Sequence, residues 1–307
     1  MNRTPDRSLE WPTLLLLALT YLVWAVGTMI WPEAPILSMI LTSVAVAQFS
    51  SLQHEALHGH PLQNDVLNEA LVFPALTIFL PYRRFRDTHL QHHYDPALTD
   101  PYDDPESNYR DPAEWARLSV ASRLLLHWNN TLAGRMVLGP ILGTGRFLWT
   151  EFVLLRSGGR AVINAWLFHA AGLVVVGAWF TIFARMPFWA YLIAVYLAFA
   201  LLRIRTFLEH RAHDLYRART VVIEDRGPLS LLFLNNNYHV VHHMHPTVPW
   251  YQLPALYAAR KAHFLRRNEG YVYRNYLEIF RQHLWRAKDP VPHPVWPVKK
   301  TPSSDGS

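Results

Sequence analysis

The stretch from residue 36 to residue 58, ILSMILTSVAVAQFSSLQHEALH, carries an apolar run directly into a pair of histidines. The apolar part follows the run at residues 12–31, which is long enough to cross a bilayer, and the two together predict a membrane hairpin. His54 and His58 lie four residues apart at the end of the second run, and such residues share one face of a helix. The stretch therefore predicts a membrane helix that directs two imidazoles to one point.

Two further histidine clusters follow the pattern HxxHH. They are His89-Leu90-Gln91-His92-His93 and His239-Val240-Val241-His242-His243. The eight clustered imidazoles are more than one zinc ion would use, whereas a pair of iron ions would use them all. The chain has no cysteine, so thiolate metal sites and a built-in iron–sulfur centre are excluded, and electrons must come from outside the chain.

The first cluster also matches HExxH, the signature of zinc metalloproteases, in which Glu55 would be the general base. That alternative leaves both HxxHH clusters unexplained. If the histidines bind two metal ions, Glu55 would not bind a metal ion itself but would lie next to the histidine ligands and support them.

Composition and patterning predict the fold class. With 51% hydrophobic and 17% charged residues, the 307-residue chain lies between soluble and polytopic membrane proteins. We predict an all-α polytopic membrane protein and one domain over 1–307, with spans at about 12–31, 36–53, 161–184 and 187–208. Segments 54–155 and 209–290 would form a helical cap that holds the histidines, and 291–307 a flexible tail. Within the cap, 67–80 is predicted as an interfacial or re-entrant helix, and 132–155 as an amphipathic surface segment.

The distribution of basic residues predicts the orientation. The turn between the first two spans carries Glu33 and no basic residue, whereas arginines gather at the opposite ends of the spans. By the positive-inside rule, both termini and all three clusters are expected in the cytoplasm, with the protein in the inner membrane of a bacterium. The net charge of +6 suits an anionic membrane surface, and no nucleic-acid-binding motif accompanies it.

Other polar residues near the clusters are candidates for supporting roles. His210, just after the fourth span, is a ninth candidate ligand, and His213 one turn further is a competitor. Neutral metal-bound imidazoles need a partner for the second ring nitrogen, commonly a carboxylate, and Asp87 and Asp95 are the preferred candidates. The remaining candidates for outer positions are Glu55, Glu209, His60, His245 and the run Asn235, Asn236 and Asn237, which is expected to cap the helix of the third cluster. His169 lies inside a span, where we expect it to form a hydrogen bond between helices.

The order HxxxH, HxxHH, HxxHH, with membrane hairpins between, resembles the membrane fatty acid desaturase and hydroxylase superfamily. The phrases Asn235-Asn236-Asn237-Tyr238-His239 and Arg205-Thr206-Phe207-Leu208-Glu209-His210 are similar to those of its bacterial branch. The resemblance implies two iron ions, O2 as co-substrate, and oxidation of an unactivated C–H bond. It implies these iron ligands: His54, His58, His89, His92, His93, His210, His239, His242 and His243. Thr206 departs from the pattern, because acyl-CoA desaturases have an asparagine at that position.

The substrate and the outcome remain open at this stage. The resemblance implies desaturation or hydroxylation of an acyl lipid or fatty acyl chain, with electrons from ferredoxin or a similar donor. The same chemistry on a small amphiphilic or amino-acid-derived metabolite is the alternative. A membrane metal transporter is a remote one, since such a protein should carry its ligands inside the spans.

Overall fold

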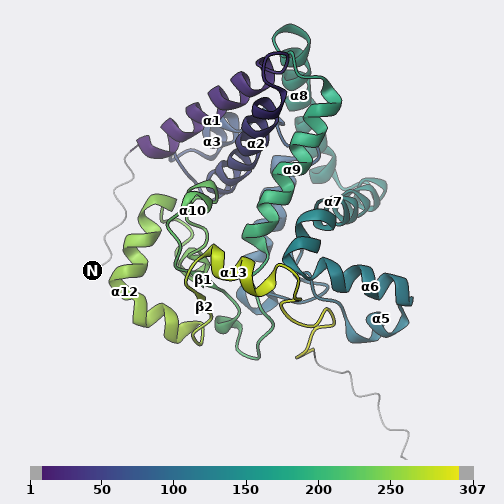
Figure 1. Cartoon of the computed structure of the whole chain (residues 1–307), viewed down its shortest axis with the longest axis vertical. Helices are drawn as coiled ribbons and strands as arrows, with labels where there is room; N and C mark the ends of the chain where they lie inside the picture. Colours follow the sequence, from purple (N-terminus) through teal and green to yellow (C-terminus); the bar gives the residue numbers. More distant parts are fainter. Residues whose placement is uncertain (1–8, 297–307) are drawn as a thin grey trace, which may run out of the picture.

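Four long apolar helices dominate the computed structural model, which describes residues 9–296. Helices α1 (Trp11–Met29) and α2 (Pro35–Leu57) form one hairpin, and α8 (Arg160–Ile182) and α9 (Phe188–Thr206) form a second (Figure 1). All four are long and apolar enough to cross a membrane. They confirm the predicted all-α polytopic fold, and the spans begin and end within four residues of the predicted bounds.

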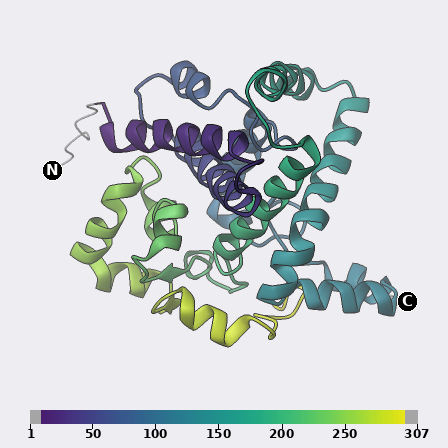
Figure 2. The ribbon, with the colours of Figure 1, turned by 45° about the horizontal axis from the view of Figure 1, so that its top comes forward.

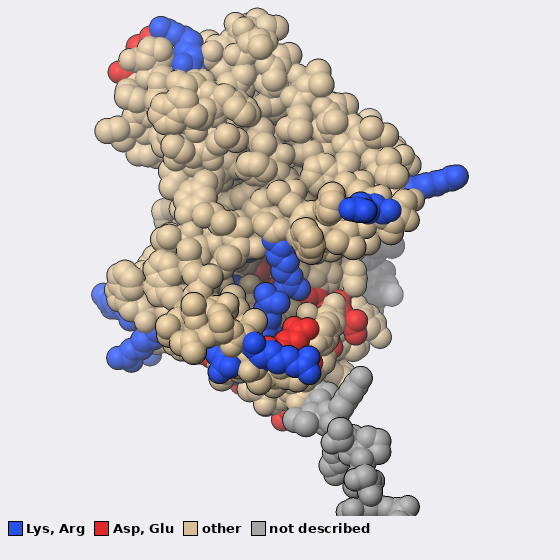
Figure 3. Space-filling model, turned by 90° about the vertical axis from the view of Figure 1, so that its right-hand side faces the viewer, with Lys and Arg blue, Asp and Glu red and all other residues tan. Residues whose placement is uncertain are grey.

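Small residues and turn contacts hold the two hairpins together. A Cβ on Gly27 would lie 2.7 Å from Thr42 Oγ1, so only glycine permits this close approach of α1 to α2. The backbone N–H groups of Arg185 and Met186 donate to Thr28 O, which joins the far turns of the hairpins. Figure 3 shows that the upper part of the molecule is largely uncharged, with charged side chains at its tip and in its lower half. This distribution is typical of a protein with a membrane-embedded part.

The segment predicted as a helix over 67–80 is helical only in its first part. Helix α3 (Asp65–Leu71) ends at Leu71. Residues 72–81 form an irregular segment that is buried at Leu76. Pro74 explains the difference, because proline has no N–H for a helical hydrogen bond. Side chains of the second hairpin bond to carbonyl groups that have no helical partner in this segment. The Tyr191 hydroxyl donates to Leu76 O at 2.7 Å, and His169 Nε2 lies 2.8 Å from Ile78 O. His169 therefore does form a hydrogen bond inside the membrane part, but its partner is this irregular segment rather than a neighbouring helix.

The segment predicted as an amphipathic surface helix forms α7 (Leu132–Arg156), which runs unbroken through Pro140. Among the described residues it is not one of the four span candidates. It carries the buried ion pair of Glu151 with Arg84, in which Arg84 Nε lies 2.9 Å from Glu151 Oε2. Helix α7 packs along α9.

Short elements complete the cap on one end of the spans. They are α4 (Tyr82–His92), α5 (Pro112–Arg117), α6 (Val120–Asn129), α10 (Pro228–Leu232), α11 (His239–Met244), α12 (Leu253–Arg267) and α13 (Tyr276–His283). Strands β1 (Val222–Ile223) and β2 (Val272–Tyr273) pair in parallel, with Val222 opposite Val272. Figure 2 shows α12 and α13 next to each other along one side of the cap.

The predicted flexible tail begins in described residues and continues beyond them. Val291 and His293 are buried, and His293 Nε2 lies 3.1 Å from Thr99 Oγ1. Residues 297–307 of the predicted tail lie outside the described residues.

Candidate metal centre

The first histidine cluster lies where α2 leaves the membrane part. Helix α2 continues four residues past the predicted span end at 53, so His54 is on the helix and His58 caps it. The centroids of their rings are 4.9 Å apart. Nε2 of each is buried and has no hydrogen-bond partner among the described residues. Two buried nitrogens on converging rings, each without a partner, fit the ligands of a metal ion.

The second cluster divides between two directions. His89 and His93 lie four residues apart at the end of α4, and their Nε2 atoms are 3.0 Å apart. His92 points elsewhere, because neighbouring helical residues differ by about 100° in direction. Its Nε2 lies 2.8 Å from Nε2 of His210, which follows the fourth span.

The third cluster, on α11, divides in the same way. His242 Nε2 lies 3.2 Å from His93 Nε2, whereas His239 Nε2 lies 3.0 Å from His210 Nε2. The ring of His243 lies 4.6 Å from that of His239, centroid to centroid. Each HxxHH motif thus contributes to two places at once.

All nine predicted ligands gather in two groups. The five-histidine group contains His54, His58, His89, His93 and His242, and the four-histidine group contains His92, His210, His239 and His243. Within each group, one nitrogen of every histidine lies within 4.8 Å of the corresponding nitrogens of the others. Neither group includes a carboxylate.

The electrostatics of the two groups fit a bound cation. Burial, with help from neighbouring imidazoles, lowers the pKa values of His210, His239 and His242 well below the ordinary range. These rings are therefore neutral at pH 7, and neutral imidazole is the form that binds metals. Neutral imidazoles whose nitrogens converge at about 3 Å repel one another unless protons or a metal ion lie between them. The residues present thus fit a pair of metal ions.

Carboxylates hold two of the histidines from behind. His89 Nδ1 lies 2.8 Å from Glu106 Oε1, and His92 Nδ1 lies 2.7 Å from Asp104 Oδ1. Burial opposes protonation of His92, but Glu106 and Asp104 outweigh it and raise its pKa to about 9, so this ring, unlike those of His210 and His239, must release a proton before its Nε2 can bind a cation. Asp104 is itself fixed, because it accepts hydrogen bonds from the N–H groups of Thr99 and Glu106, each at 2.9 Å. A carboxylate on Nδ1 leaves Nε2 free to face the metal.

Of the two preferred carboxylates, Asp87 does not contact a histidine. Asp87 is exposed, and it pairs with Arg84 and Arg86 rather than with a histidine. The side chain of Asp95 lies outside the described residues. Asp104 and Glu106, which do contact histidines, were not among the preferred candidates. The available signal was the turn-forming sequence Asp103-Asp104-Pro105-Glu106, which returns the chain to α4.

The three asparagines before α11 do not cap it, contrary to expectation, since Tyr238 is at the cap position and no side chain bonds there. Asn235 has a φ of 53° and donates to Trp250 O. Asn237 donates to the carbonyls of β1 and the residues after it. Asn236 alone contacts a site histidine: its Oδ1 lies 3.2 Å from His239 Nδ1.

A chain of polar contacts extends behind Asn236. Its amide nitrogen donates to Glu209 Oε1 at 3.0 Å, and Glu209 pairs with Arg205 Nε at 3.1 Å. Glu209 Oε1 is 3.8 Å from His239 Nδ1. Glu209, a predicted supporting residue, therefore lies beside the four-histidine group and reaches His239 through Asn236.

Glu55 and the remaining candidates have different neighbours. Glu55 lies 3.8 Å from His54 Nδ1 and accepts from the backbone N–H of Trp250 at 3.2 Å, so it ties α2 to the segment after α11. His60 Nδ1 lies 2.6 Å from Glu10 Oε1 near the start of α1. His213 accepts from Leu215 N, and His245 packs on the ring of Phe264, so neither belongs to a histidine group.

Two buried polar groups near His210 were not predicted in these positions from the sequence. Lys288 Nζ donates to the carbonyl of His210 at 2.6 Å, which ties the segment after α13 to this ligand. The Thr206 hydroxyl, one turn before His210, is buried without a hydrogen-bond partner among the described residues.

Four helices long enough to span a membrane, with nine converging histidines at one end, define the class as a membrane protein with two candidate metal sites. The chain belongs to the fatty acid desaturase family, whose sequence model matches residues 28–275. It is also 27% identical to a protein named beta-carotene ketolase from Paracoccus sp. (strain N81106 / MBIC 01143). That match covers 226 residues, which are 70% of this chain and 75% of the relative. The chain is therefore an integral membrane oxidoreductase of the desaturase and hydroxylase type, from a family that generally uses iron.

Proposed function

We propose that this protein is an O2-dependent oxidoreductase that uses two iron ions to desaturate or hydroxylate an acyl lipid or fatty acyl chain. The observation that carries the proposal is the division of nine buried imidazoles into groups of five and four at one end of the spans. Each group would hold one iron ion. With irons bound, such a site supplies O2 activation for removal of hydrogen from an unactivated C–H bond.

The overall reaction balances with an external electron donor. In hydroxylation, one oxygen atom of O2 enters the C–H bond, and the other leaves as water after uptake of two electrons and two protons. In desaturation, the substrate gives up two hydrogens, and with the same two electrons and two protons O2 becomes two waters. Because the chain has no cysteine with which to hold an iron–sulfur centre, the electrons would come from ferredoxin or a similar protein.

Several residues of the chain would hold and orient the histidines of the site. Asp104 and Glu106 hold Nδ1 of His92 and His89, and the chain Arg205–Glu209–Asn236 orients His239. Packing of α2 against α9 buries the ligand-bearing end of the hairpins and keeps water from it. In the proposed orientation, the cap and both termini are in the cytoplasm of a bacterium, with the spans in the inner membrane.

A carotenoid-like polyene is a second candidate substrate, because the relative from Paracoccus is named for a ketolase of beta-carotene. A small amphiphilic or amino-acid-derived metabolite is the other alternative for the same site. The metalloprotease interpretation fits less well, because His54 and His58 meet three further histidines and Glu55 accepts a backbone hydrogen bond.

The test combines metal analysis of detergent-purified protein with lipid profiling of cells that express it. We expect about two irons per chain, and a new double bond or hydroxyl group in an acyl chain. His242→Ala should abolish the product and lower the bound iron, while the exposed His263→Ala should change neither. Two irons with unchanged acyl lipids would refute the acyl substrate and favour a polyene or a small metabolite. A single zinc ion would refute the proposal.

A further inference from the structure

Two arginines meet where α7 packs on α9. A Cβ on Gly139 of α7 would lie 3.1 Å from Arg135 Cδ and 3.3 Å from Arg203 Cδ, so the two side chains run past each other. A Cβ on Gly143 would lie 2.2 Å from Arg203 Nη2. The two glycines therefore leave the space that the guanidinium group of Arg203 occupies.

Neither arginine has a paired counter-ion. Among residues 9–296, no carboxylate forms an ion pair with either guanidinium. Arg135 is 2% exposed, and its Nη1 is buried without a hydrogen-bond partner. Burial and the charge of Arg203 lower the pKa of Arg135 to about 10. Asp289, which attracts Arg135, is already engaged by Lys288 and Asn130.

Two neighbouring cations in a poorly hydrated place are unfavourable unless an anion joins them. Guanidinium groups are well suited to carboxylate and phosphate, which they bind with paired N–H donors. The unpaired Arg203 and the open Nη1 of Arg135 together offer such donors. The arrangement therefore calls for an anionic group at this position.

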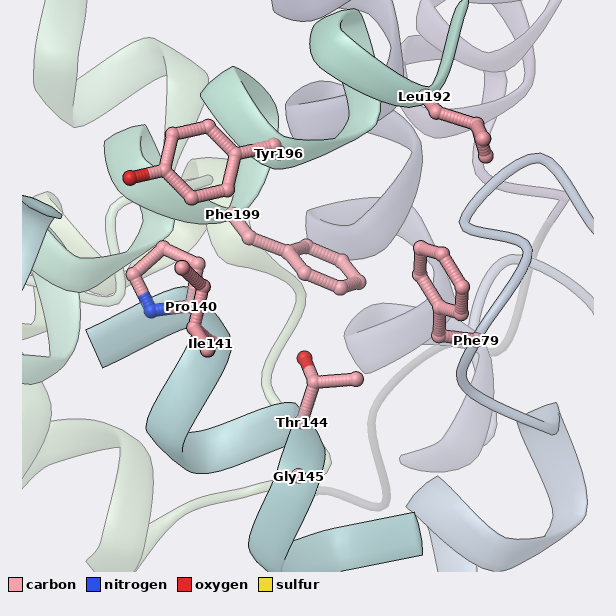
Figure 4. Close-up of a pocket in the computed structure, with 8 residues that line it drawn as sticks. All are labelled: Phe79, Pro140, Ile141, Thr144, Gly145, Leu192, Tyr196 and Phe199. Atoms are coloured by element: carbon pink, nitrogen blue, oxygen red, sulfur yellow. The ribbon is translucent and has the colours of Figure 1, made fainter. Parts of the chain in front are cut away.

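An apolar cavity of about 300 Å³ lies along the same two helices. Figure 4 shows the rings of Phe79 and Phe199 and the side chain of Thr144 directed toward a common space between α7 and α9. The cavity is lined by Phe79, Pro140, Ile141, Thr144, Gly145, Leu192, Tyr196 and Phe199. On α9, Arg203 lies one turn beyond Phe199, on the same helix face.

We propose that the cavity and the two arginines form one binding site for an amphiphile with an alkyl chain and a carboxylate or phosphate group. The chain would lie in the cavity, and the anionic group would bind Arg203 and Arg135. The order along α9 is Leu192, Tyr196, Phe199, Arg203, and then the ligand His210 beyond its end. At a rise of about 1.5 Å per residue, Arg203 is about 6 Å nearer than Phe199 to that end.

The bound amphiphile would therefore turn its polar end, rather than the tip of its chain, toward the histidines. Glu106 and Glu209, which contact site histidines, attract Arg203 from that side. This inference rests on the proposed function in one respect: it takes the amphiphile to be the substrate of the histidine site. A neutral polyene has no group for the arginines.

The test is equilibrium binding to the purified full-length protein in detergent, without turnover. Radiolabelled palmitate, a 16-carbon lysophosphatidate and hexadecanol have the same chain and differ in the head group. A charge-assisted contact should favour the anions over the alcohol at least tenfold. Arg203→Gln should abolish that preference without changing hexadecanol binding or metal content, and Arg203→Lys should retain part of it.

A second variant tests the cavity. Gly145 lines it, and a Cβ there would meet nothing within 4 Å, so Gly145→Leu should fill the space and weaken all three ligands. Gly177→Leu is the matched control, because Gly177 is a helical glycine of α8 with equally open surroundings. A wild type that binds the alcohol as tightly as both anions would overturn the proposal, as would an unchanged preference in Arg203→Gln.

The two proposals fail in different ways. An intact preference for anions in a protein that oxidises no lipid would refute the proposed function and leave the binding site in place. Lipid oxidation that does not depend on Arg203, with no preference for anions, would refute the binding site alone. A preference for palmitate over lysophosphatidate identifies a free fatty acid, and the reverse identifies a phospholipid-like headgroup.

Discussion

Replacement of Asp104 by asparagine tests how the four-histidine group is held. The carboxylate accepts three hydrogen bonds: from His92 at 2.7 Å, and from the backbone N–H groups of Thr99 and Glu106 at 2.9 Å. Asparagine keeps one oxygen and replaces the other by an NH2 group. Either that group faces the Thr99 N–H, or it faces the His92 ring. In both orientations two donors meet in a site where Asp104 is 2% exposed.

The expected cost follows from that geometry. An unsatisfied buried donor costs about 1–3 kcal/mol, and loss of an outer partner of a metal-bound histidine typically lowers metal affinity about 10–100-fold. The two figures agree, because a tenfold change corresponds to about 1.4 kcal/mol. We therefore expect Asp104→Asn to lower the affinity of the four-histidine group for its metal ion by this factor. The affinity of the five-histidine group should be nearly unchanged.

The assay is metal retention against increasing chelator, measured by mass spectrometry of the purified protein. Asp104→Asn should retain one ion at chelator concentrations at which the wild type retains two. Asp87→Asn is the matched control, because this exposed carboxylate lies on α4 but contacts only arginines. Retention of both ions by Asp104→Asn as in the wild type, or an equal loss in the control, would refute this role of Asp104.

Two other substitutions have definite expected outcomes. Lys288→Met removes the donor to the His210 carbonyl, so the four-histidine group should lose its ion first while the other group keeps its own; equal loss from both groups in metal analysis would contradict this. Gly172→Ala should lower the unfolding free energy by about 1–2 kcal/mol, because its Cβ would lie 2.6 Å from the backbone oxygen of Phe73. Gly177→Ala, on the same helix with open surroundings, should instead raise it by about 0.5–1 kcal/mol, and thermal unfolding in detergent would detect the opposite signs.

The membrane helices and the histidine clusters could be predicted from sequence because each has a local signature. An apolar run of about 20 residues and a histidine spacing of three or four depend only on helix geometry. The division of HxxHH between two groups was not accessible. It depends on how α4 and α11 are rotated relative to α2, which is set by packing between distant segments.

The supporting residues show the limit of proximity in sequence. Asp87 is two residues from His89, but residues two apart on a helix do not face each other. Asp104 and Glu106 are more distant along the chain and reach the histidines because a turn returns the chain to α4. Helix periodicity alone argues against Asp87, whereas the fold of the returning loop depends on tertiary contacts. The end of α3 before Pro74 was similarly readable, but the burial of residues 75–77 was not.

The distribution of the histidines along the chain has a consequence for biosynthesis. Each group takes ligands from α4 and from α11, so neither is complete before the ribosome has passed residue 243, by which time both hairpins have been synthesised. Under the proposed function, iron must be loaded after both hairpins are in the membrane. Until then the exposed imidazoles would bind copper or zinc more tightly than ferrous iron. Correct maturation would therefore depend on which metals the cell makes available at that membrane surface during the interval.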